Sequence, residues 1–334
     1  MNEISKKPRI ILKNIQSKVW EHPADRLALN SLRSIPALDT VLKAIFGSTT
    51  EKSIRLIALA SSVRANEKQF SRVYAIHLEA CKTLDVNEIP ELFISQNPFL
   101  NAGAVGMTKP FITLNSATVD ILDDEELLGV IAHEVGHIMS GHVLYKTLLQ
   151  VLLKVSNLVF NIPLTGLALA GLIAALKEWD RKSELSADRA GLLAMQNPDT
   201  ATKLLMKLTG GNKLDQMDLG EFIKQAEEYR KSESISDSVY KFLNILNASH
   251  PFPVVRVLEL INWVQTGEYE QILNGNYSTG NKNFYETAKD AAKSYSEDIK
   301  NATNPIKDVV DNAKDKFDEA SKKAKDAFDN WRKK

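Results

Sequence analysis

The chain has 334 residues, and its 42 basic and 42 acidic side chains give a formal net charge of zero. That balance provides no basic surface for phosphate contacts, so we expect no nucleic-acid partner. A single cysteine, Cys81, excludes an internal disulfide and fits a reducing compartment, which favours a cytoplasmic protein. The length suffices for one large or two modest domains with a full core.

The N-terminal part of the chain is predicted to be helical. Residues 1–20 contain no long apolar run and no small-residue cleavage site, so we expect no secretory signal there. Apolar residues then recur at helical spacing between about Leu27 and Asp85. We therefore predict that residues 1–85 form a helical region packed on the domain that follows, which we place at 86–270.

Two short strands are predicted next, over 90–95 and 111–115, where apolar residues alternate. Gly103, Gly106 and Pro110 punctuate the segment between them. The edge of such a sheet could pair with an extended polypeptide, main chain to main chain, and we assign Phe111 and Thr113 to substrate binding on this basis. The alternative is an ordinary sheet that only supports the helices.

A helix is predicted after the second strand. Asp123 and Glu126 have the spacing of a capping box, and apolar residues follow on one helical face: Leu127, Val130, Ile131, Val135, Ile138 and Met139.

The helix carries His133-Glu134-Val135-Gly136-His137. Residues four apart share a face, so both imidazoles can reach one metal ion, with Glu134 beside it. Two nitrogen donors, an open coordination position and a carboxylate base are the requirements of a zinc hydrolase. The alternative is a solvated helix with two surface histidines.

His142 does not extend this motif in a simple way. A metzincin would have glycine three residues and histidine six residues after His137, but these positions hold Ser140 and Val143. That class is therefore excluded. We expect His142 to support a neighbouring residue or the structure instead of binding metal directly.

A third protein ligand must come from elsewhere, and the segment 181–190 offers the best candidates. Glu184 and Asp188 lie four residues apart on one face of a predicted helix. One carboxylate can complete the coordination while the other accepts the remaining N–H of a ligand histidine. Taken alone, such a pair is more typical of a solvated helix face. Together with the upstream histidine motif, the pair favours a metal site.

Residues 155–176 form an uncharged run long enough to span a membrane. His137 precedes the run and Glu184 follows it, so a single crossing would separate two residues that must reach the same ion. We predict a helical hairpin at 143–178 instead. It either covers the catalytic domain or touches the membrane surface, or else it inserts into the membrane.

The C-terminal part is predicted to contain a polar linker at 271–284 and an amphipathic helical tail at 285–334. The tail places apolar residues three or four apart from Val309 to Trp331. It could bind a membrane surface or a partner, lie over the substrate cleft, or dock on its own domain.

The chain resembles the zinc metallopeptidases that include the HtpX heat-shock proteases and the CaaX prenyl-protein proteases. Five segments in the same order carry the resemblance: Asn101-Ala102, Phe111–Asn115, His133–His137, Glu184–Asp188, and Ser249-His250-Pro251 followed by Arg256. The integral-membrane relatives have transmembrane helices before the histidine motif, and this chain has none there.

The resemblance implies a mainly α fold with a small β-sheet (α+β) and a zincin-like catalytic domain. It also implies roles for particular residues: one Zn²⁺ on His133, His137 and Glu184; Glu134 as catalytic base; Asp188 holding a ligand; His250 and Arg256 near the substrate carbonyl; Asn101 and Ala102 at the substrate. The expected activity is metalloendopeptidase cleavage of extended polypeptides, with protein quality control as the role by analogy. The alternatives are an inactive adaptor that binds unfolded proteins at the membrane surface, and a structural zinc site, which is usually closed by cysteine and histidine.

Overall fold

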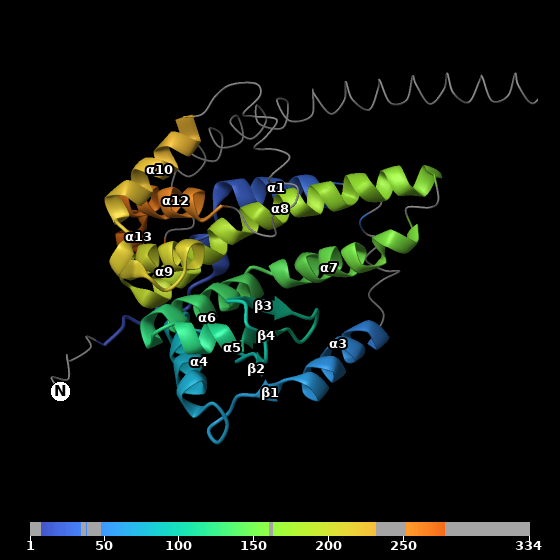
Figure 1. The fold of residues 1–334 in the computed structure, drawn as a ribbon, viewed down its shortest axis with the longest axis horizontal. Coiled ribbons are helices and arrows are strands. Elements are labelled where there is room, and N and C mark those ends of the chain that lie inside the picture. The colour runs from blue at the N-terminus through green and yellow to red at the C-terminus, as the bar shows by residue number, and fades with distance from the viewer. Residues whose placement is uncertain (1–7, 35–37, 39–47, 160–162, 232–251, 278–334) are drawn as a thin grey trace, which may run out of the picture.

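The computed structural model describes residues 8–34, 38, 48–159, 163–231 and 252–277 (Figure 1). They form a mostly helical structure with one small sheet, which confirms the α+β class. His250, the second half of the linker (278–284) and the tail at 285–334 lie outside the described residues.

The helices and strands follow one another along the chain with the labels of Figure 1. The helices are α1 (Pro23–Arg33), α3 (Ser48–Ser61), α4 (Ser71–Thr83), α5 (Ser116–Ile121), α6 (Asp124–Met139), α7 (His142–Val159), α8 (Pro163–Met195), α9 (Pro198–Gly210), α10 (Leu219–Lys231), α12 (Pro253–Gln265) and α13 (Glu268–Leu273). The strands are β1 (Val63–Arg64), β2 (Leu92–Ser95), β3 (Ala102–Val105) and β4 (Phe111–Asn115), and two short 3-10 turns lie at Ser17–Val19 and Leu214–Gln216.

The four strands form a mixed sheet in the order β1-β2-β4-β3. β2 and β4 are parallel, and the other two pairs are antiparallel. Alternate residues of β2 and β4 pack with α4 and α6 in the main core, whereas Phe93 and Phe111 pack edge to face beneath Ala58 of α3. Both faces of the sheet are covered, which explains why its central strands are mainly apolar.

The prediction that strand 111–115 offers an edge to a substrate is wrong. β4 lies between β2 and β3, so its main-chain groups are already paired on both sides. Phe111 is buried, and the Thr113 hydroxyl donates to the Gly103 carbonyl at 3.1 Å inside the sheet. The edge strands are β1 and β3, and β3 is the one that pairs with β4. The sequence of β3, Ala-Gly-Ala-Val, lacks the alternation of large apolar residues from which strands are predicted.

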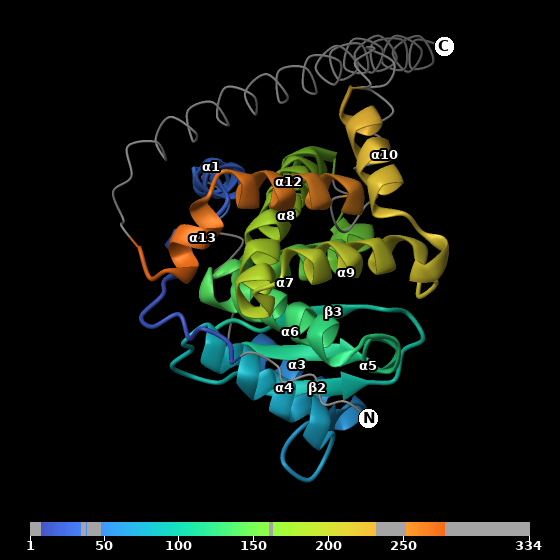
Figure 2. The same ribbon diagram turned by 90° about the vertical axis from the view of Figure 1, so that its left-hand side faces the viewer.

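Helix α6 begins with the predicted capping box. Asp123 Oδ1 accepts from the Glu126 N–H at 2.9 Å, and Glu126 Oε2 accepts from the Asp123 N–H at 3.0 Å. The helix is buried along most of its length and separates the sheet from α1, α10 and α12 (Figure 2).

α6 and α8 pack at unusually close range. A Cβ placed on Gly136 would lie 2.5 Å from the Ala190 Cβ, and one on Gly191 would lie 3.0 Å from the Gly129 carbonyl oxygen. Glycine in the middle of the histidine motif thus allows the close approach of two backbones. The consequence is that the helix carrying His133 and His137 lies directly against the helix carrying Glu184 and Asp188.

Helices α7 and α8 run side by side as a long hairpin (Figure 1). Gly141, with φ of +69°, ends α6 and lets the chain turn, so that α7 starts at 94° to α6. α8 continues without interruption from Pro163 to Met195, and therefore places Glu184 on the second arm of the hairpin. Among the described residues, no single helix is long and apolar enough to cross a membrane; α6 with the first part of α7 meets that test only as a bent pair.

Candidate active site

Three potential metal ligands converge between α6 and α8. His133 Nε2 and His137 Nε2 lie 3.3 Å and 3.2 Å from the two carboxylate oxygens of Glu184. The donor atoms of these three residues all lie within 4.8 Å of one another. Two imidazole nitrogens and one carboxylate are a donor set typical of catalytic zinc sites. The residues therefore fit a bound metal ion.

The second nitrogen of each histidine is held by another side chain. His133 Nδ1 lies 3.1 Å from Asp188 Oδ1, and His137 Nδ1 lies 3.0 Å from His142 Nδ1. Such contacts fix the orientation of each ring and leave both Nε2 atoms facing Glu184. Asp188 and His142 thus lie beside the two histidines, as their predicted supporting roles require.

The two histidines differ in basicity. Burial lowers the pKa of His133, but Asp188 and Glu184 outweigh it and raise the pKa to about 9. Burial, together with the nearby Lys146 charge, holds the pKa of His137 well below its usual value. A metal ligand must be deprotonated, so binding an ion here would displace a proton from His133.

Arg256 on α12 forms a bidentate ion pair with Asp188. Its Nε donates to Oδ2 at 2.7 Å and its Nη2 donates to Oδ1, and both side chains are buried. Burial alone would raise the pKa of Asp188, but the Arg256 charge outweighs it and lowers the pKa. Arg256 also lies at the cavity wall, with Nη1 4.0 Å from Glu184 Oε2. The structure thus shows Arg256 in an ion pair with α8 and at the cavity, and its place near a substrate carbonyl stays a prediction.

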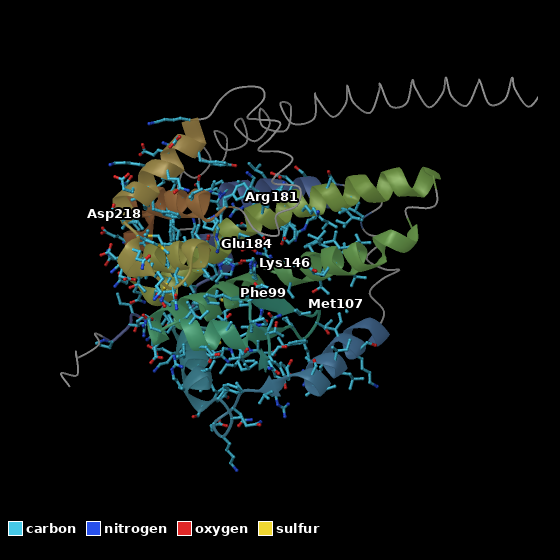
Figure 3. The ribbon with its side chains drawn as sticks, viewed as in Figure 1. Phe99, Met107, Lys146, Arg181, Glu184 and Asp218 are labelled. Carbon is cyan, nitrogen blue, oxygen red and sulfur yellow. The ribbon has the colours of Figure 1, made fainter. Side chains whose placement is uncertain are left out.

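Sequence reasoning missed a partly buried lysine beside the ligand carboxylate. Lys146 of α7 donates to Glu184 Oε1 and to Asp180 Oδ1, each at 2.7 Å (Figure 3). The available signal was a lysine among the leucines of the first half of α7. Lys146 does not line the cavity, so we assign it to holding the Glu184 carboxylate in place.

Glu134 lies next to the three ligands and is 6% exposed. The backbone N–H of Ala104, in the edge strand β3, donates to its carboxylate. Its Oε2 is buried and has no hydrogen-bond partner among the described residues. Burial raises the pKa of Glu134 above its usual value, although the His133 charge opposes the shift. A carboxylate with a raised pKa is a better proton acceptor.

A cavity of about 410 Å³ opens onto these residues. His133, Glu134 and Glu184 form part of its wall together with Asn101 and Ala102 at the start of β3. Many of the other lining residues are apolar and lie on α8, α9 and α12, including Met195, Leu204, Leu205 and Leu260. Of the four residues predicted to bind substrate, Asn101 and Ala102 therefore lie at the cavity, and Phe111 and Thr113 do not.

Two histidines four residues apart, a carboxylate from a following helix and a buried glutamate between them define a metal-dependent peptidase. Comparison with protein families agrees: the model of peptidase family M48 matches residues 67–264. The chain belongs to peptidase family M48. The expected resemblance to HtpX-type metallopeptidases is thereby confirmed.

Curated relatives include the plastoglobule-localized metallopeptidase 48 of Arabidopsis thaliana chloroplasts. It is 32% identical over 272 residues, which cover 80% of this chain and 78% of that protein. The protease HtpX homolog of Helicobacter acinonychis is 33% identical over 93 residues, which cover 27% of this chain and 30% of that protein. The protease HtpX homolog of Tropheryma whipplei is 28% identical over 148 residues, which cover 36% of this chain and 51% of that protein. No solved structure matches.

Proposed function

We propose that the chain is a zinc-dependent endopeptidase. The convergence of His133, His137 and Glu184 beside the buried Glu134 is the observation that carries the proposal. A zinc ion bound there would polarise the scissile carbonyl and lower the pKa of a coordinated water. The lack of a second cysteine argues against a closed structural zinc site.

Glu134 has the surroundings of a general base. The Ala104 N–H holds one side of its carboxylate, while Oε2 has no partner among the described side and main chains. That oxygen is available to take a proton from the attacking water and return it to the departing amine. An adaptor that only binds unfolded chains has no use for such a group.

The edge strand β3 supports binding of an extended substrate. The Asn115 N–H donates to the Asn101 carbonyl, so Asn101, Gly103 and Val105 direct their main-chain groups toward β4. By the alternation of antiparallel pairs, Ala102 and Ala104 direct theirs away from the sheet. Ala102 lies at the cavity, where its main chain can pair with a polypeptide. Recognition of main chain favours cleavage within a chain and broad sequence preference.

Removal of the metal should abolish cleavage. We expect the purified chain to hold about one zinc ion and to cleave an internally quenched peptide that has both termini blocked. A chelator should stop the reaction, because Glu134 alone cannot activate water sufficiently, and added zinc should restore it. Metal content and fluorescence are measured on the same samples, with a mock-treated control.

Three results would contradict parts of this proposal. Cleavage confined to peptides with a free terminus would mean an exopeptidase. Binding of an unfolded protein such as casein without cleavage would favour the adaptor. A folded chain that binds no metal would remove the basis of the proposal.

We also propose that the end of the molecule formed by α3 and the far ends of α7 and α8 contacts a membrane surface. These segments lie toward the same end of the long axis (Figure 1). Leu56 and Ile57 of α3 are 54% and 65% exposed. Residues 155–176 carry no charge. Contiguous exposed apolar residues mark interaction sites, and the plastoglobule localisation in the name of one relative agrees with a lipid surface.

Replacing Leu56 and Ile57 together by serine should weaken vesicle binding. Burying one such side chain stabilises by about 1.5–3 kcal/mol, so partitioning onto lipid vesicles should fall at least about tenfold. The measurement is flotation with vesicles of anionic and zwitterionic phospholipid, with Ala60→Ser on the same helix as control. Equal flotation of the double variant would exclude α3, and wild-type protein that stays unbound would exclude the contact altogether.

A further inference from the structure

A buried network connects the metal site to the N-terminal helix. Asp25 of α1 is fully buried, yet its carboxylate accepts hydrogen bonds from Trp179 Nε1 at 3.1 Å and from Ser186 Oγ at 2.6 Å. Both donors lie on α8, the helix that carries Glu184. Burying a carboxylate is costly unless several donors compensate for lost water. The Trp179 and Ser186 donors therefore compensate the Asp25 carboxylate for its burial.

His142 joins this carboxylate to a metal ligand. Its Nε2 lies 3.0 Å from Asp25 Oδ2, and its Nδ1 lies 3.0 Å from His137 Nδ1. The left-handed turn at Gly141 makes the contact possible, because it folds the start of α7 back against the end of α6. His142 and Asp25 are both 0% exposed, and His137 is 1% exposed, so water does not compete for these contacts.

The positions of the hydrogens follow from the geometry. His137 presents Nε2 to the metal site, and a neutral imidazole that binds metal there carries its hydrogen on Nδ1. The Nδ1 of His142 must then accept this hydrogen bond, so His142 carries its own hydrogen on Nε2. That nitrogen lies 3.0 Å from Asp25 Oδ2. The reverse arrangement would set a bare nitrogen against a buried carboxylate.

We propose that Asp25 is a positioning residue of the metal centre, which acts through His142 to fix the tautomer and the ring orientation of His137. The inference rests on the metal site of the proposed function. It extends that site to α1, which lies outside the residues 67–264 that the family model matches. A purely structural alternative exists, because the same contacts dock α1 on α8, and the experiment must separate the two.

Asp25→Asn should weaken zinc binding about tenfold, as replacement of groups that orient ligand histidines usually does. His142→Phe removes both nitrogens and should weaken binding further. In the His142→Phe background Asp25→Asn should have no additional effect, because its route to His137 is gone. Zinc dissociation constants are measured on the full chain by chelator competition, and the thermal stability of the metal-free protein is recorded alongside.

Leu32→Ala is the matched control, because Leu32 of α1 is buried in an apolar cluster with Leu148 and Leu172 and so helps to dock α1 without a hydrogen bond to Asp25. It should lower thermal stability and leave zinc affinity unchanged. Wild-type zinc affinity in a folded Asp25→Asn variant, or equal losses of affinity in both backgrounds, would overturn the inference. Loss of zinc binding by the wild-type chain would instead overturn the proposed function.

Imidazole nitrogen NMR on the zinc-loaded wild-type chain tests the same inference if Asp25→Asn fails to fold. We expect hydrogen on Nδ1 of His137 and on Nε2 of His142. A hydrogen on Nδ1 of His142 would contradict the relay.

Discussion

Replacing Glu134 by glutamine should reduce peptide cleavage about 100- to 10,000-fold, the range that general acid–base groups contribute. The amide has nearly the shape of the carboxylate but cannot accept the proton of water. Metal content should stay at the wild-type level, because Glu134 is not among the three converging ligand residues. The variant should also be at least as stable as wild type, since burial already disfavours the charged form and raises the pKa of Glu134.

The test compares metal content, the thermal unfolding midpoint and cleavage of the blocked peptide in the wild type, Glu134→Gln and Glu221→Gln. Glu221 is a solvated residue of α10 that pairs only with Lys224 among the described side chains. The control should match wild type in all three measurements. Full activity of Glu134→Gln would assign the proton transfer to another group, and lost metal would make Glu134 part of the binding site.

The central part of this site could be predicted because its spacing is local. Residues four apart on one helix share a face whatever the rest of the chain does, so His133 with His137 and Glu184 with Asp188 could be paired from the sequence. The capping box that starts α6 is local in the same sense. These predictions required only that the two helices meet, which the glycine and alanine side of their interface allows.

The missing parts depend on contacts between distant segments. Asp25 and Lys146 reach the site from α1 and α7, and no spacing in the sequence connects them to His137 or Glu184. The edge strand β3 is made of small residues and gives no alternation signal. The order of strands in a sheet is set by tertiary packing, so the sequence alone wrongly favours β4 as an edge strand. The helices that carry the site and the faces of those helices could be predicted from the sequence. The side chains that reach the site from other helices, such as Asp25 and Lys146, could not.

Arg256→Met should lower the free energy of unfolding by about 3–5 kcal/mol, which is typical when one partner of a buried ion pair is removed. The Asp188 carboxylate would stay buried next to Glu184 without the charge that lowers its pKa. Arg256→Lys keeps a positive charge but loses the bidentate geometry, so it should be intermediate. Adding Asp188→Asn to Arg256→Met should recover part of the loss, because the unpaired charge is then gone.

Urea unfolding of the chelator-treated chain measures this prediction without any contribution from metal or substrate. The same variants, loaded with zinc, are assayed for cleavage, and kcat is separated from KM. If Arg256 served mainly the substrate carbonyl, Arg256→Met would lower kcat and leave the unfolding free energy unchanged. A stability loss that Asp188→Asn partly repairs would mean that the arginine acts through Asp188, and so through the orientation of His133. The two histidines of the motif would then each depend on a buried carboxylate from outside their own helix: His133 on Asp188, and His137 on Asp25 through His142.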